Sequence, residues 1–136
     1  MDHLAVLVRL AALEVERERR ALAELDATIE QLRHQIALAR AEAERERRAA
    51  TDLAGARLLA AYLEASRRRL RMAATELAQL EQVRAGHLTR LIEQRLELKR
   101  LELLRARDAQ RRQVEASRRA QRNIDELAVI GAARRR

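Results

Sequence analysis

The sequence lacks cysteine, proline, tryptophan and phenylalanine, and its 136 residues include three glycines and one tyrosine. Without cysteine the chain can form neither a disulfide nor a thiolate-held zinc site, which excludes thiol redox chemistry. Residues that favour strands are scarce, so no sheet is expected. The longest apolar run, residues 4–13, is interrupted by Arg9 and is far shorter than the ~20 residues of a membrane span. The opening residues also lack a secretory-signal pattern, so we expect a cytoplasmic chain.

What the sequence does contain is typical of long helices. Hydrophobic residues make up 48% and charged residues 37% of the chain, and most of them are Ala, Leu, Glu and Arg. The formal net charge is +8, and residues 101–136 alone hold ten basic and five acidic residues. Such asymmetry points to nucleic acid, anionic lipid or an acidic protein as a partner, and charge alone does not choose among them.

Apolar residues recur at alternating intervals of three and four through residues 4–53. This is the 3.5-residue repeat that keeps one face of a helix against a partner helix. Thirteen of the fifteen positions are apolar, and Glu18 and Glu46 are the exceptions. The apolar positions are Leu4, Val8, Ala11, Val15, Leu22, Leu25, Ile29, Leu32, Ile36, Ala39, Ala43, Ala50 and Leu53. The pattern predicts one helix over residues 3–49, with Asp2 as its N-cap.

A second apolar run extends from Leu59 to Leu101, so the chain must reverse either near Gly55 or near Gly86. A reversal near residue 54 pairs residue i with roughly residue 108 − i and leaves the arginine-rich residues beyond about 105 overhanging. A reversal near Gly86 would instead expose the apolar opening segment, which is disfavoured. We therefore predict an all-α, antiparallel coiled-coil hairpin whose second helix is longer and overhangs, with Gly86 as a local soft spot.

The predicted bounds make the whole chain, residues 1–136, a single domain. They are a helix over about 3–49, a turn over about 50–57, a helix over about 58–128 and a basic tail over 129–136. Near the end, apolar residues return at 124, 127 and 130, and no other part of a hairpin reaches them. An external partner is one explanation of this stripe, and a frayed tail is the other.

No catalytic residue, metal site or cofactor is predicted. The glycines and the single lysine, Lys99, do not have phosphate-loop spacing, and the three histidines are far apart. The acidic clusters are expected to be solvated faces of a rod that has no pocket and no small-molecule substrate. They are Glu14, Glu16 and Glu18, and Glu42, Glu44 and Glu46.

Two non-enzymatic alternatives stay open. The arginines at 67–71 and 105–122 suit non-specific nucleic-acid binding, although the chain has no recognised reading motif and almost no aromatic residues to stack on bases. Alternatively, the chain could be a structural coiled coil that self-associates as a parallel dimer of uninterrupted helices. Whether the hairpin is a monomer or a dimer is left undecided, because both use the same seam.

The order of features resembles the FliJ family, the flagellar type III export proteins whose virulence counterpart is YscO. The features are the apolar opening Leu4–Leu10, the segment Ala60–Glu64 with Tyr62 after the turn, and the terminal segment Asn123–Ala128 with its Asp-Glu-Leu sequence. The resemblance covers nearly the whole chain.

The resemblance implies a non-enzymatic stalk of a hexameric export ATPase, located in the cytoplasm at the export apparatus. It implies that the joined terminal end enters the hexamer and promotes its activity, and that the protein also binds a membrane export gate and escort chaperones. The candidate ATPase contacts are Leu4, Leu7, Arg111, Arg112, Arg118, Arg119, Arg122, Asp125, Glu126 and Leu127. The candidate gate contacts are Tyr62 and Leu63, although Tyr62 could simply pack at the hairpin tip. Nucleic acid is not an expected partner under this resemblance.

Overall fold

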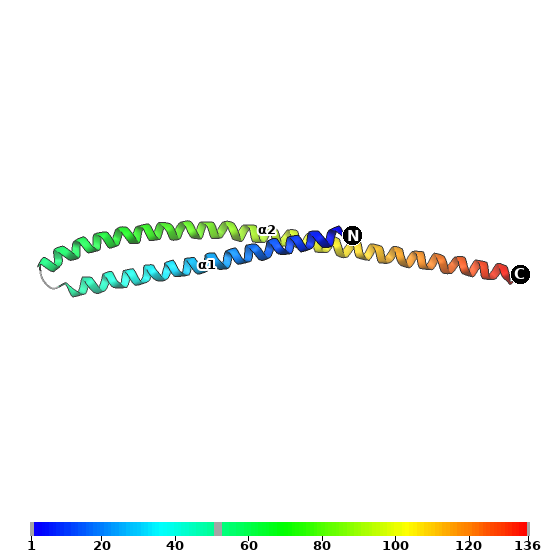
Figure 1. The fold of residues 1–136 in the computed structure, drawn as a ribbon, viewed down its shortest axis with the longest axis horizontal. Coiled ribbons are helices and arrows are strands. Elements are labelled where there is room, and N and C mark those ends of the chain that lie inside the picture. The colour runs from blue at the N-terminus through cyan, green and yellow to red at the C-terminus, as the bar shows by residue number, and fades with distance from the viewer. Residues whose placement is uncertain (1, 51–52, 136) are drawn as a thin grey trace. The chain divides into compact units, whose positions relative to one another are not determined.

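The protein is described by a computed structural model that covers residues 2–50 and 53–135. These residues form two helices, α1 (His3–Ala49) and α2 (Leu53–Arg134), and they include no strand. The two helices pack against each other in antiparallel directions, and α2 has 82 residues against 47 in α1 (Figure 1). The predicted all-α hairpin with a longer second helix is therefore confirmed. The alternative of one uninterrupted helix per chain is wrong, because α1 ends before Ala50.

Helix α1 begins where the sequence places its cap. The backbone N–H of Ala5 donates a hydrogen bond of 3.1 Å to Oδ1 of Asp2, which satisfies one of the donors left free in a first helical turn. This bond, together with the nearby guanidinium groups of Arg105 and Arg112, holds the pKa of Asp2 below its ordinary value. The interior of α1 then continues without glycine or proline to Ala49.

Helix α2 is longer at both ends than the predicted 58–128. It begins at Leu53 and therefore includes Gly55 and most of the predicted turn, while residues 51–52 lie outside the described part of the chain. No described glycine has a positive φ, so Gly55 does not end a helix through a left-handed conformation. A lone glycine among Ala, Leu and Arg costs a helix only ~1 kcal/mol, which explains why it is tolerated. Most of the predicted tail, up to Arg134, is also helical, because the helix tolerates Gly131 as it tolerates Gly55.

The chain groups into two compact units, which we call the terminal unit and the turn unit. The terminal unit comprises Met1–Glu14 and Gln94–Arg136, and the turn unit comprises Val15–Glu93. Each unit contains a part of α1 and a part of α2, so each has its own section of the seam.

In the turn unit the core is a single row of apolar side chains at the predicted spacing. The buried residues from α1 are Val15, Leu22, Ile29 and Ile36, each seven residues after the last, and α2 contributes Leu91. The other seam positions of α2 in this unit are half-buried, except Ser66, which is buried. They include Leu59, Leu63, Leu70, Ala73, Leu77 and Leu80. Burial every 3.5 residues on both helices confirms the seam.

The predicted soft spot near Gly86 is not a break. α2 passes through it, and the two polar side chains beside it are paired across the seam. Nδ1 of His87 hydrogen-bonds to the carboxylate of Glu18, and Nε of Arg84 donates to Oδ1 of Asp26. Glu18 is only 9% exposed, so its carboxylate lies in the seam. The expectation that Glu18 belongs to a solvated face is therefore wrong. Pairing makes the buried Glu18 and the half-buried His87, Arg84 and Asp26 acceptable in the hairpin.

Cross-helix ion pairs define the register in each unit. In the turn unit, Nη2 of Arg33 lies 2.8 Å from Oε1 of Glu81, and this hydrogen bond, with a second one to Glu30, raises the pKa of Arg33. In the terminal unit, Nε of Arg105 lies 3.4 Å from Oδ2 of Asp2. The predicted partners of residues 33 and 2 are residues 75 and 106. Glu81 therefore lies six residues from the predicted partner of Arg33, whereas Arg105 lies one residue from the predicted partner of Asp2.

The terminal unit covers its apolar opening segment only partly. Ala11 and Leu101 are buried and Leu4 and Val8 are half-buried, as a seam requires. However, the outward side of the segment, which consists of Val6, Leu7, Leu10 and Leu13, is 46–55% exposed. The reversal near residue 54 therefore shields only part of the segment, because a single partner helix covers only one face of α1.

The seam predicts that truncating a buried aliphatic side chain lowers the free energy of unfolding far more than truncating an exposed one. Ile29 is 3% exposed and Leu58 is 74% exposed. Ile29→Ala should lower the free energy of unfolding by about 2–4 kcal/mol, because it removes buried methyl groups and leaves a cavity. Leu58→Ala should change it by less than about 0.5 kcal/mol. Urea unfolding followed by circular dichroism measures both, and equal losses would show that the seam does not form the core.

The cap and ion pair of Asp2 predict a pH-dependent contribution. Because the folded-state pKa of Asp2 is below its ordinary value of 3.8, the stabilisation is complete above that value and is lost as the pH falls through the lowered one. Asp2→Asn retains a capping oxygen but removes the charge that faces Arg105. The variant should therefore have a lower Tm than the parent at neutral pH, and the difference should shrink as the pH falls below 3.8. A pH-independent difference would exclude this ionic contribution.

Candidate functional site

The part of α2 beyond its pairing with α1 is the most exposed stretch of the terminal unit. Every residue from 109 to 130 is exposed, so this stretch, which we call the tail helix, packs against no other described segment. The candidate ATPase residues Arg111, Arg112, Arg118, Arg119 and Arg122 all lie on it. An isolated helix surface of this length is available to a partner along all of its faces.

The tail helix has a charged face. At 3.6 residues per turn, Arg111, Arg118 and Arg122 fall on one line along the helix, and Arg119 lies beside them. Within the described residues these four guanidinium groups form no ion pair. By contrast, Nη2 of Arg112 lies 2.9 Å from Oδ2 of Asp108, one turn earlier on α2. Four arginines with unused donors can each bind a carboxylate through two parallel hydrogen bonds.

The opposite face of the tail helix is apolar. Ala116, Ala120, Ile124 and Leu127 recur every three or four residues, and Ile124 and Leu127 are 59% and 67% exposed. The candidate residue Leu127 belongs to this face.

The two candidate acidic residues, Asp125 and Glu126, belong to the charged side of the tail helix and are exposed. Asp125 accepts a hydrogen bond of 3.1 Å from Nε2 of Gln121 within the same helix. The tail helix is thus amphipathic, with charge on one side and small or branched apolar residues on the other.

The remaining candidate ATPase residues, Leu4 and Leu7, differ in role. Leu4 is half-buried in the seam of the terminal unit, where it packs as a core residue. Leu7 is 47% exposed and lies on the outward side of α1 with Leu10 and Val6. Of the two, Leu7 has the side chain that a partner can contact.

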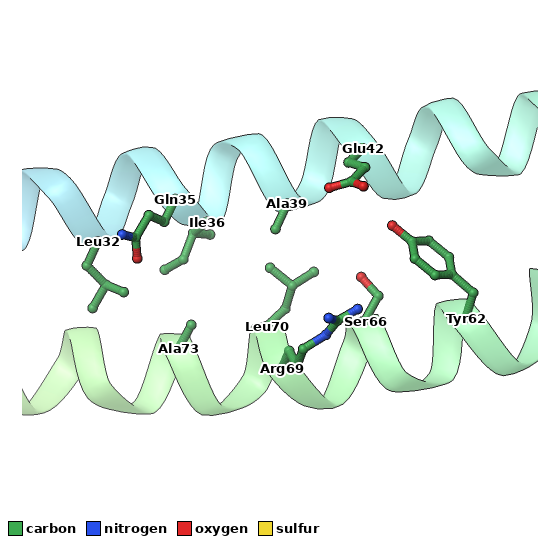
Figure 2. A pocket seen from close by; sticks show the side chains of 10 residues that line it. All are labelled: Leu32, Gln35, Ile36, Ala39, Glu42, Tyr62, Ser66, Arg69, Leu70 and Ala73. Carbon is green, nitrogen blue, oxygen red and sulfur yellow. The ribbon is translucent and has the colours of Figure 1, made fainter.

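The candidate gate residues Tyr62 and Leu63 lie in the turn unit and are half-buried, so part of each side chain packs in the hairpin and part remains accessible. Tyr62 borders a groove of about 290 Å³ between α1 and α2. Figure 2 shows its hydroxyl directed across this groove toward Glu42 of α1, with the hydroxyl of Ser66 pointing into the gap. Leu32, Ile36 and Leu70 form the apolar floor of the groove (Figure 2).

Small seam residues create this groove. Ala39, Ser66 and Ala73 occupy seam positions that hold leucine or isoleucine elsewhere in the unit, and their short side chains do not fill the space between the helices. Sequence reasoning expected no pocket on a two-helix rod and missed the groove. The signal was present in the run of alanine and serine at seam positions, because interhelical space closes only when large side chains interdigitate.

The arrangement offers exposed surfaces to which a partner can bind. Among the described residues no group of three or more His, Asp or Glu side chains is close enough to hold a metal ion. Likewise, neither described helix is long and apolar enough to cross a membrane.

The chain matches the sequence model of a known protein family. The sequence model of a protein family described as Flagellar FliJ protein matches residues 1–136, the full length of the chain. Neither the curated proteins nor the solved structures contain a match.

Proposed function

The chain belongs to the flagellar FliJ protein family and is therefore a flagellar type III export-related protein; from this premise we propose that it is the non-enzymatic stalk of a hexameric export ATPase. In this proposal the whole chain works as one domain at the cytoplasmic side of the export apparatus. The observation that carries the proposal is the tail helix, which has no partner among the described residues and carries four arginines without ion pairs.

The tail helix is proposed to enter the ATPase hexamer. The line of Arg111, Arg118 and Arg122 would bind carboxylates along the inner wall, and the face with Ile124 and Leu127 would bury against apolar residues there. Arg112, Arg119, Asp125 and Glu126 would border the same contact, and Leu4 and Leu7 would flank it on α1. A helix with two chemically different faces can bind a ring in a defined orientation, which a uniformly basic helix could not. Binding in this manner would promote assembly and activity of the ATPase.

The turn unit is proposed to contact the export gate through Tyr62 and Leu63. The groove beside Tyr62 is lined by apolar side chains and has a polar rim, which is the composition of a site that accepts one large side chain of a partner. Escort chaperones are proposed as further partners of the stalk. These roles are the ones that the family implies, and the groove beside Tyr62 supports the gate contact on this chain.

The ATPase contact predicts a position-specific loss of activation. The triple variant with Arg118, Arg119 and Arg122 each changed to Glu should weaken binding to the cognate ATPase at least about tenfold and abolish stimulation of ATP hydrolysis, because attraction to carboxylates becomes repulsion. The matched control changes Arg45, Arg68 and Arg71 to Glu, three exposed arginines of the turn unit.

The control variant should stimulate the ATPase as the parent does, and both variants should keep the parent's helicity by circular dichroism. Full stimulation by the tail variant would contradict the proposed site. If both variants lose stimulation together and the parent shifts an oligonucleotide in a salt-dependent manner, the surface is a general polyanion binder instead.

The gate contact predicts a separate phenotype. Tyr62→Ala should weaken binding to the cytoplasmic part of the cognate gate protein by about tenfold, because it removes an aromatic side chain that borders the groove. Stimulation of the ATPase should be unchanged, since Tyr62 belongs to the turn unit. Calorimetric titration with each partner measures the two effects, and an unchanged gate affinity would place the contact elsewhere.

A further inference from the structure

One edge of the seam in the turn unit carries a row of arginines. On α1 they are Arg33, Arg40 and Arg47, spaced by seven residues and therefore on the same edge of the helix. Arg33 alone of the three has an acid opposite, Glu81 of α2, at 2.8 Å. The described residues provide no ion pair for Arg40 or Arg47.

The register explains why the other two arginines lack acids. In an antiparallel pair, moving seven residues forward on α1 corresponds to moving seven residues back on α2. From the pair of Arg33 and Glu81, this step places Ala74 opposite Arg40, and a second step places Arg67 opposite Arg47. A groove lined by both Arg40 and Ala74 agrees with the first step. The second step sets two like charges at facing positions, and Arg67 also forms no ion pair with any described residue.

The surface beside this arginine row is an apolar groove. A groove of about 330 Å³ lies along it, with Ile36 and Leu77 at the bottom and Ala37, Ala74 and Ala78 at the rim. Methyl side chains at the rim allow the backbone of another helix to approach closely, because the interaxial distance of packed helices depends on the side chains at their contact. This groove differs from the groove in Figure 2, because Tyr62 lines that groove and does not line this one.

We propose that this edge seats a third helix, supplied by a partner protein whose docking face is apolar and whose flank is acidic. We call the surface the basic edge and define it by Arg40, Arg47, Arg67, Ala74 and Ala78. Carboxylates of the partner take the place that Glu81 holds for Arg33, and its apolar residues cover the alanine rim.

A protein helix fits this surface better than a nucleic acid does. A phosphate backbone would pair with the arginines but would leave the alanine-lined groove uncovered. The basic edge also has no aromatic side chain on which a base could stack. The proposal is independent of the ATPase contact, because that contact uses the tail helix of the other unit.

The test uses the full chain and a fluorescein-labelled synthetic helix that has a Leu and Ala face flanked by Glu. The double variant Arg40→Glu with Arg67→Glu should weaken binding of this peptide at least about tenfold in fluorescence anisotropy. The charge-matched control is Arg45→Glu with Arg68→Glu, two exposed and unpaired arginines that lie away from the seam edges. The control should change the affinity by less than about twofold, and circular dichroism should show the same helicity for both.

A second variant tests the same surface by adding an acid. Ala74→Glu places a carboxylate opposite Arg40, as Glu81 stands opposite Arg33, so the hairpin should keep or raise its Tm while the peptide binds at least about tenfold more weakly. Unchanged peptide affinity in this variant would overturn the proposal.

Two further results would also overturn it. The first is equal affinity for a matched peptide in which Gln replaces every Glu, because the acidic flank would then be irrelevant. The second is tighter binding of a single-stranded oligonucleotide with the same dependence on Arg40 and Arg67, which would make the basic edge a phosphate-binding surface.

Discussion

A helix with an apolar residue every 3.5 positions needs a second helix along that stripe, and this need determines the structure. Each unit meets it by pairing α1 with α2, as the buried Ile29 shows in the turn unit and the buried Ala11 in the terminal unit. A two-helix seam buries little, so its other faces remain in water and are polar along most of their length. Because α2 has 82 residues and α1 has 47, a stretch of α2 must lack a partner among the residues that the structure describes. The tail helix is that stretch.

Apolar residues alone do not define which part of α2 faces which part of α1. Leucine replaces leucine after a shift of one heptad, so a purely aliphatic seam would accept several registers. The polar seam positions do not allow this, because a shift would separate Glu18 from His87 and Asp26 from Arg84 and leave charges partly buried without partners. Arg84 and His87, the polar residues that interrupt the second apolar run, therefore select the observed register.

Most of the fold could be predicted from the sequence because one periodicity dictates it. The seam positions, the cap at Asp2 and the unpaired arginine-rich end all follow from spacing and side-chain chemistry. Three features could not be predicted from one helix at a time. The pairing of His87 with Glu18, the groove beside Tyr62 and the row in which Arg40 lacks an acid all depend on the register between two helices. A change of register by a few residues alters every one of them while the apolar pattern stays the same.

The candidate binding surfaces occur where the rules of a stable two-helix coil are not followed. Large side chains at Ala39 and Ala73 would close the groove of the turn unit, and an acid at Ala74 would neutralise Arg40. A sequence selected only for a stable hairpin would be expected to have large side chains at positions 39 and 73 and an acid at position 74. Elsewhere it does have such residues, as Ile29 and the pair of Arg33 and Glu81 show. The stabilisation that the hairpin forgoes at these positions can be recovered when a partner fills the groove and supplies the missing carboxylates, which couples the stability of this chain to binding.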